Sequence, residues 1–156
     1  MIIGLVDCIT NKMDAHAILD PLVQQTDFSI QVFTCPEPFK APVAVKKAFD
    51  SGVDVVMVYA ETSEEQKEAV DLMHEKILDL EISSGKYAYY ALLFDEEWRV
   101  EHQMRAIAEK RLQQTLQEIM ESTHGIKREQ TEEVPPVESE AQEFIQTETP
   151  HGRPLF

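Results

Sequence analysis

The stretch 53–59, Val-Asp-Val-Val-Met-Val-Tyr, decides the fold class of this chain. Every residue in it except Asp54 is apolar, and most are β-branched, which favours an extended strand. A strand with one face in water alternates apolar and polar residues, whereas this one is apolar in both alternating sets. It must therefore be covered on both faces, as in a parallel sheet flanked by helices. We predict that 53–59 is a buried strand of an α/β protein.

The segments on either side of this strand repeat one order, a strand followed by a helix. Apolar runs predict three more strands, at 2–6, 28–34 and 87–94. Apolar residues at helical spacing predict four helices, at 12–25, 42–50, 62 or 63 to 84, and 96–122. This order predicts a four-stranded parallel sheet with right-handed crossovers, in a three-layer α/β/α arrangement.

Capping signals indicate where these helices begin and end. Thr10 or Asn11 is a candidate N-cap for the first helix, which Pro21 either kinks or divides. Asp95 is placed to cap the last helix, and Gly85 to end the third. The helices are thus expected to start within a few residues of each strand end.

The composition of the chain changes near residue 122. From 123 onward glutamate and proline are frequent and the apolar periodicity is lost. A segment of this kind buries too little apolar surface to form a packed unit. We predict one α/β domain over 1–122 and an acidic, proline-containing, flexible C-terminal tail over 123–156.

The charge balance narrows the range of partners. The chain has 14 Lys and Arg against 29 Asp and Glu, a formal net charge of −15. A surface of this sign repels phosphate backbones, so nucleic-acid binding is not expected.

The first apolar run is far shorter than the about 20 residues of a membrane helix, and it lacks the basic start of a signal peptide. We expect a cytoplasmic protein with no membrane partner.

The two cysteines, Cys8 and Cys35, each lie at the end of a predicted strand. No Cys or His spacing is typical of a zinc site, so no metal site is predicted. The simplest interpretation is two small side chains in a reducing compartment. A redox role is the less favoured alternative, because no signal of reactivity accompanies the pair.

The common phosphate-binding and hydrolase motifs of α/β proteins are missing from the sequence. It contains no GxGxxG, no GxxxxGK[ST] and no GxSxG. The general rule for open parallel sheets remains, that ligands bind beyond the carboxyl ends of the strands. The segments expected there are 7–12, 34–40, 59–63 and 94–98.

A series of short segments resembles one protein family. The segments are Ile-Gly-Leu-Val-Asp at 3–7, Lys-Met-Asp at 12–14, Thr-Cys-Pro at 34–36, 42–47, 52–57, His-Glu at 74–75 and Ala-Glu-Lys-Arg at 108–111. Over residues 2–120 they are similar in order and spacing to archaeal-type riboflavin synthases, relatives of lumazine synthase that share its fold. The resemblance implies a flavodoxin-like, lumazine synthase-like sheet.

The resemblance also implies a transferase activity and an assembly. Two molecules of 6,7-dimethyl-8-ribityllumazine would be converted into riboflavin and a ribitylamino-pyrimidinedione. No organic cofactor is implied, and a divalent cation is the one auxiliary group left open. The partner would be the small lumazine or flavin molecule, bound between the subunits of a homopentamer.

Site residues follow from the same resemblance. His74, oriented by Glu75, and Lys12 are implied as catalytic groups that move protons. The implied substrate-binding residues are Asp7, Asp14, Thr34, Pro36, Lys110 and Arg111.

Five of these residues also have a simpler interpretation. Asp7 and Asp14 suit a helix cap, and His74 suits a surface or subunit interface. Lys110 and Arg111 suit ion pairs with Glu109 or a neighbouring acid.

Two other functions stay open at this point. A non-catalytic ligand-binding, scaffold or regulatory protein is favoured by Glu37 and by the loop 60–63, where the family has glycine, and by Thr10, where it has an aromatic residue. Lumazine synthase itself is a further alternative.

Overall fold

The computed structural model of this protein describes residues 1–131, with side chains placed through residue 123. The strands are β1 (Ile2–Cys8), β2 (Ser29–Cys35), β3 (Val55–Thr62) and β4 (Ala88–Phe94). The helices are α1 (Ala15–Val23), α2 (Ala41–Asp50), α3 (Lys67–Ser84) and α4 (Glu101–Thr131). Short 3₁₀ helices are η1 (Pro38–Lys40), η2 (Glu64–Gln66) and η3 (Asp95–Glu97). The chain divides into two units, Met1–Met120 and Glu121–Phe156, of which the first holds the sheet.

The four strands form one parallel sheet in the order β2-β1-β3-β4, which confirms the predicted architecture. Val6 of β1 is in register with Phe33 on one side and Val58 on the other. β3 is buried from Val55 to Ala60, as its apolar sequence predicts for a strand inside the sheet.

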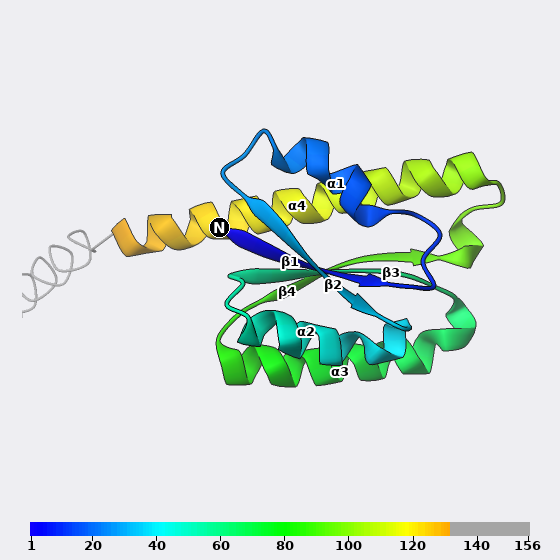
Figure 1. Ribbon diagram of the computed structural model, residues 1–156, viewed down its shortest axis with the longest axis horizontal. Helices are drawn as coiled ribbons and strands as arrows, with labels where there is room; N and C mark the ends of the chain where they lie inside the picture. The colour runs from blue at the N-terminus through cyan, green and yellow to red at the C-terminus, as the bar shows by residue number, and fades with distance from the viewer. Residues whose placement is uncertain (132–156) are drawn as a thin grey trace, which may run out of the picture. The chain divides into compact units, whose positions relative to one another are not determined.

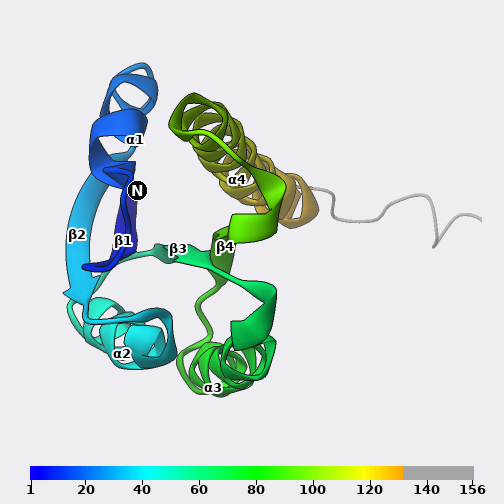
Figure 2. The ribbon, with the colours of Figure 1, turned by 90° about the vertical axis from the view of Figure 1, so that its right-hand side faces the viewer.

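Helices cover both faces of the sheet in the first unit (Figures 1 and 2). Helices α2 and α3 lie on one face, over a core that includes Val6, Val56 and Val58. Helix α1 and the part of α4 within this unit lie on the other, over Leu5 and Met57. Because successive side chains of a strand point to opposite faces of the sheet, the same strands contribute residues to both cores.

The first helix begins later than the capping signals predict. It starts at Ala15, and its N-cap is Asp14, whose carboxylate accepts a hydrogen bond from the Ala17 amide at 3.1 Å. Thr10 and Asn11 are therefore not its caps. Residues 9–13 form a loop instead, because residues 11–13 make hydrogen bonds to the end of β3, as described below. Pro21 lies inside the helix.

The third and fourth helices are each preceded by a 3₁₀ turn that was not predicted. Thr62 is the last residue of β3, and Ser63 precedes η2 rather than α3. Asp95 begins η3 rather than capping α4. Gly85 ends α3 with a left-handed φ of 71°, as predicted.

The last helix extends beyond its predicted end at residue 122. α4 continues to Thr131, so residues 123–131 belong to this helix. The run Lys127-Arg128-Glu129-Gln130 consists of good helix formers, which explains the extension despite Gly125. The prediction for 132–156 falls outside the described residues. Among the helices of the described chain, none is both long and apolar enough to cross a membrane.

Candidate functional site

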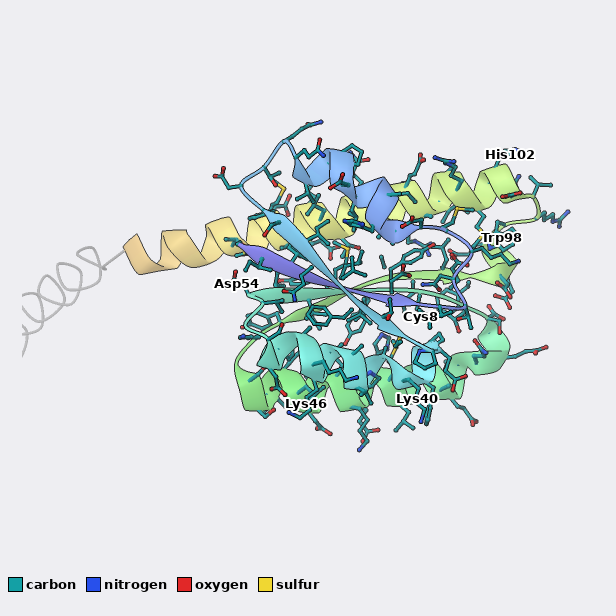
Figure 3. All side chains as sticks on the ribbon, in the orientation of Figure 1. Cys8, Lys40, Lys46, Asp54, Trp98 and His102 are labelled. Atoms are coloured by element: carbon teal, nitrogen blue, oxygen red, sulfur yellow. The ribbon has the colours of Figure 1, made fainter. Side chains whose placement is uncertain are left out.

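The strand order places the topological switch point of the sheet between the carboxyl ends of β1 and β3, and we call this position the crevice. After β1 the chain passes to α1 on one face of the sheet, and after β3 it passes to α3 on the other face. The two loops therefore separate where the strands are adjacent, which is the usual ligand position in open parallel sheets. Cys8 and Trp98 lie at this end of the sheet and Asp54 at the opposite end (Figure 3).

Asn11 joins the two strand ends in the crevice. Its Nδ2 donates to Asp7 Oδ1 at 2.7 Å and to the Tyr59 backbone oxygen at 3.1 Å. Its Oδ1 accepts from the Glu61 backbone N–H at 2.9 Å. One amide side chain thus fixes the position of Asp7 relative to the end of β3.

Glu61 holds the first loop from the other side. One carboxylate oxygen accepts the Lys12 amide at 2.6 Å, and the other accepts the Met13 amide at 2.9 Å and the Tyr59 hydroxyl at 2.9 Å. Sequence reasoning assigned no site role to Asn11 or Glu61. Both lie in segments expected at the carboxyl ends of the strands, 7–12 and 59–63, and Glu61 is a charged residue at the end of a largely apolar strand.

Asp7 is a carboxylate of this crevice with a raised pKa. Burial raises the pKa of its carboxyl group, and the negative charges of Asp14 and Glu61 act in the same direction. The hydrogen bond from Asn11 opposes them. Burial also raises the pKa of the Tyr59 hydroxyl. A positioned carboxyl group with a raised pKa holds a proton more readily than an ordinary carboxylate, which suits it to accept and return one.

Lys12 points its charge toward an aromatic ring. Its Nζ lies 5.1 Å from the centroid of the Trp98 ring, a cation–π contact between the first loop and the segment before α4. Trp98 packs against the core that α1 and α4 cover. Its Nε1 is buried and has no hydrogen-bond partner among the described residues.

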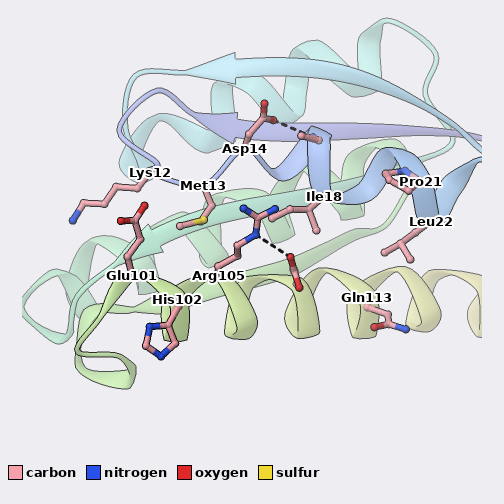
Figure 4. Close-up of a pocket in the computed structure, with 12 residues that line it drawn as sticks. Lys12, Met13, Asp14, Ile18, Pro21, Leu22, Glu101, His102, Arg105 and Gln113 are labelled. Carbon is pink, nitrogen blue, oxygen red and sulfur yellow. Dashed lines mark hydrogen bonds and ion pairs between the residues drawn. The ribbon is translucent and has the colours of Figure 1, made fainter.

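Lys12 and Asp14 also line a cavity of about 970 Å³ between α1 and α4. Figure 4 shows its mixed walls, with Met13 and Ile18 on one side and the charged groups of Glu101 and Arg105 on the other. Arg105 is paired there with Glu109 at 3.1 Å.

Thr34 and Pro36 line a different cavity, of about 230 Å³, at the end of β2. Lys40 and Lys47 bring two positive charges to it, and Cys35 forms part of its wall. This cavity lies on the face of the sheet covered by α2.

His74 lines a third cavity, of about 560 Å³, between α3 and the end of β4. Its ring meets that of Tyr90 edge to face, with the centroids 4.4 Å apart. Glu75 is exposed, and within the described chain no hydrogen bond joins it to His74. The structure does not bring together the predicted His-Glu pair.

Lys110 and Arg111 lie beside a fourth cavity, of about 450 Å³, with Glu97. Arg111 makes a bidentate ion pair with Glu97 and also donates to the Leu92 backbone oxygen. The hydrogen bonds from Arg111 lower the pKa of Glu97. The Arg111 guanidinium thus forms its ion pair within its own chain, with Glu97 rather than with Glu109. Lys110 is exposed.

The described residues contain no cluster of three or more His, Cys, Asp or Glu side chains that could hold a metal ion. The cavities described above divide the predicted site residues into four groups rather than one. Asp7, Lys12 and Asp14 lie between the end of β1 and the start of α1, while Thr34 with Pro36, His74, and Lys110 with Arg111 lie at separate cavities.

No protein-family model matches the sequence, and a search of curated proteins also gives no match.

Proposed function

We propose that this chain is a transferase of the riboflavin-synthase type, which converts two molecules of 6,7-dimethyl-8-ribityllumazine into riboflavin and a ribitylamino-pyrimidinedione. The proposal rests on the resemblance of the segments over 2–120. The structural observation that carries it is that Asp7 and Thr34 are register partners near the carboxyl ends of β1 and β2, the end of a parallel sheet where such folds bind ligands.

The cavities support a site that is shared between copies of the chain. The cavity at Thr34 lies by β2 and the one at His74 lies by β4, and these strands are the opposite edges of the sheet. Both cavities are on the face covered by α2 and α3. A ring of copies in which the β2 side of one meets the β4 side of the next would join the two cavities into one pocket.

Exposed apolar side chains beside the first of these cavities are in keeping with such a contact. Phe39 and Val43 are 45% and 56% exposed around η1 and the start of α2. Covering them would remove apolar surface from water. The resemblance gives the number of copies in the ring as five.

The reaction asks the protein to hold two flat heterocycles in contact and to move protons between them. In this proposal Asp7 is the proton-transfer group of the first loop, because its pKa is raised and Asn11 fixes its position. Lys12 and Asp14 bind polar atoms of the ligand, and His74 of the neighbouring cavity contacts it across the interface. A cytoplasmic location belongs to the same proposal, in keeping with two free thiols.

A non-catalytic lumazine- or flavin-binding protein is the second candidate. One observation favours it: the Glu61 carboxylate lies at the loop where the related enzymes have glycine, and it holds the first loop by two backbone amides. A loop held in this way has less freedom to close around two substrates.

The test is to mix the purified chain with 6,7-dimethyl-8-ribityllumazine, with and without Mg²⁺, and to follow riboflavin by absorbance. The proposal expects turnover by the wild type, a loss of at least about a hundredfold in Asp7→Asn, and unchanged turnover in Asp50→Asn, an exposed carboxylate on α2. The native mass should be that of a pentamer.

Ligand binding separates the two candidates. Quenching of lumazine fluorescence without product would replace the enzyme by the non-catalytic binder. A monomer that neither turns over nor binds the lumazine would overturn both.

A further inference from the structure

Two cysteines meet at the carboxyl edge of the sheet. Cys8 is the last residue of β1 and Cys35 the last of β2, and they are register partners in the parallel ladder. Both are free and buried, and their Sγ atoms lie 3.2 Å apart. The first loop begins directly after this pair, where the Ile9 amide donates to the Cys35 backbone oxygen at 2.8 Å.

The backbone at this pair suits a covalent bond between the sulfurs. Neighbouring strands lie about 4.8 Å apart, within the Cα separations of about 4.4–6.8 Å found across disulfides. Register partners in a parallel pair point to the same face of the sheet, and both thiols lie in the core under α2. The sulfurs need to approach each other by only about 1 Å to reach bonding distance.

The two thiols differ in acidity and in access. The hydrogen bond between them lowers the pKa of the Cys35 thiol and raises that of Cys8, so Cys35 is the first to become a thiolate. Cys35 also lines the cavity of about 230 Å³ into which Lys40 and Lys47 bring positive charge. This cavity gives a small neutral oxidant a route to Cys35, which is otherwise buried.

We propose that Cys8 and Cys35 are a built-in dithiol pair that closes to a reversible disulfide when the protein meets hydrogen peroxide or another hydroperoxide. The Cys35 thiolate attacks a peroxide oxygen, so that an S–O bond forms, the O–O bond breaks, and the hydroxide that leaves takes a proton to become water. The Cys8 sulfur then attacks the Cys35 sulfur of the sulfenic acid. The S–S bond forms as the S–O bond breaks, and the departing hydroxide takes the Cys8 proton as a second water. The thiols lose two electrons and the peroxide gains them.

The disulfide would tie the ends of β1 and β2 together immediately before the loop that carries Asn11 and Lys12. The inference stands apart from the proposed function, because it rests on the thiols alone and its test measures no turnover.

The experiment uses the full chain, reduced, freed of reductant and exposed to hydrogen peroxide, with the remaining thiols then alkylated. Trypsin cuts after Lys12 and Lys40, so the two cysteines fall in separate peptides, 1–12 and 13–40. The expected product is these two peptides joined by a disulfide, with no linkage between chains, and it should disappear on treatment with dithiothreitol. The linked peptide should form about tenfold faster in the folded chain than in urea, because the fold holds the sulfurs together.

Single variants test the assigned order. Cys8→Ala should leave a Cys35 sulfenic acid that dimedone traps, whereas Cys35→Ala should leave a Cys8 that reacts more slowly with peroxide than Cys35 does in Cys8→Ala. Circular dichroism confirms that each variant is folded. Three results would overturn the proposal: alkylatable thiols that persist in the folded wild type, linkage only between chains, or equal rates in the folded and unfolded chain.

Discussion

Asn11 Nδ2 lies 2.7 Å from Asp7 Oδ1, and this hydrogen bond connects the first loop to the end of β1. The same amide group reaches the backbone of β3 at Tyr59 and Glu61. A single side chain thus sets the spacing of the two strand ends that border the crevice. Its hydrogen bond also lowers the pKa of the Asp7 carboxyl group, which burial raises.

Asn11→Ala should destabilise the protein by about 1–3 kcal/mol, because it leaves partly buried polar groups without their partner. It should also raise the pKa of Asp7 further, since the hydrogen bond that lowers it is lost. Urea unfolding and a carboxyl NMR titration measure the two effects. Gln24→Ala is the matched control, because it removes an exposed amide–carboxylate hydrogen bond to Asp20 and should change the stability by less than about 0.5 kcal/mol. An unchanged Asp7 titration would contradict the assigned role of Asn11.

Asp7 should make the protein less stable as the pH rises. Its pKa is raised in the folded state, so between the unfolded and folded pKa values the folded chain binds more protons. Its contribution therefore destabilises the fold increasingly through that window and stays constant above it. Asp7→Asn keeps an oxygen that accepts from Asn11, and it should gain stability relative to wild type as the pH passes from 4 to 7. Unfolding curves at several pH values measure this, and parallel pH profiles for the two proteins would refute it.

Arg111→Ala should destabilise the protein by about 1 kcal/mol, because the bidentate pair with Glu97 is partly exposed and water screens it. The pKa of Glu97 is lowered in the folded state, so the contribution of the pair is present above the unfolded pKa and is lost as the pH falls through the folded one. Arg105→Ala, which breaks the exposed pair with Glu109, should cost less than about 0.5 kcal/mol. Thermal unfolding at two pH values measures the stability that each of the two variants loses. Equal costs for the two variants would show that the Glu97 pair adds nothing.

Gly4 allows α2 to approach β1 closely. A Cβ atom at this position would lie 3.2 Å from the Ala48 Cβ and 3.2 Å from Val53 Cγ2, both in the core. Gly4→Ala should therefore cost about 1–3 kcal/mol through overpacking. The double variant with Val53→Ala, which removes the second neighbour, should show less than the sum of the two single losses. Strict additivity would place the cost elsewhere.

The Cys8–Cys35 disulfide should stabilise the oxidised protein. It closes a loop between residues 27 positions apart in the sequence, which corresponds to roughly 3 kcal/mol in the chain-entropy description. Urea unfolding of the oxidised and reduced forms gives the difference, with the Cys8→Ala variant under the same oxidant as the control. A less stable oxidised form would show that the bond distorts the ends of β1 and β2.

The sequence by itself determined the local elements and their class. The run 53–59 is apolar on both faces, so the fold had to provide a helix layer on either side of a parallel sheet. Gly85 was also correctly placed, because ending a helix in a left-handed conformation is a local requirement. The N-terminal helix boundaries were less predictable, since Asp14 competes with Thr10 and Asn11 as a cap, and contacts far along the chain decided between them.

Only the tertiary structure decided which polar groups share a crevice. The order β2-β1-β3-β4 puts β1 beside β3 and joins Asn11 to Glu61, 50 positions away. The same order makes Cys8 and Cys35 register partners. The packing of α4 against β4 lets Arg111 form its ion pair with Glu97 instead of Glu109. Hydrophobic periodicity reports which face of an element is buried, but strand order and register depend on how distant segments pack together.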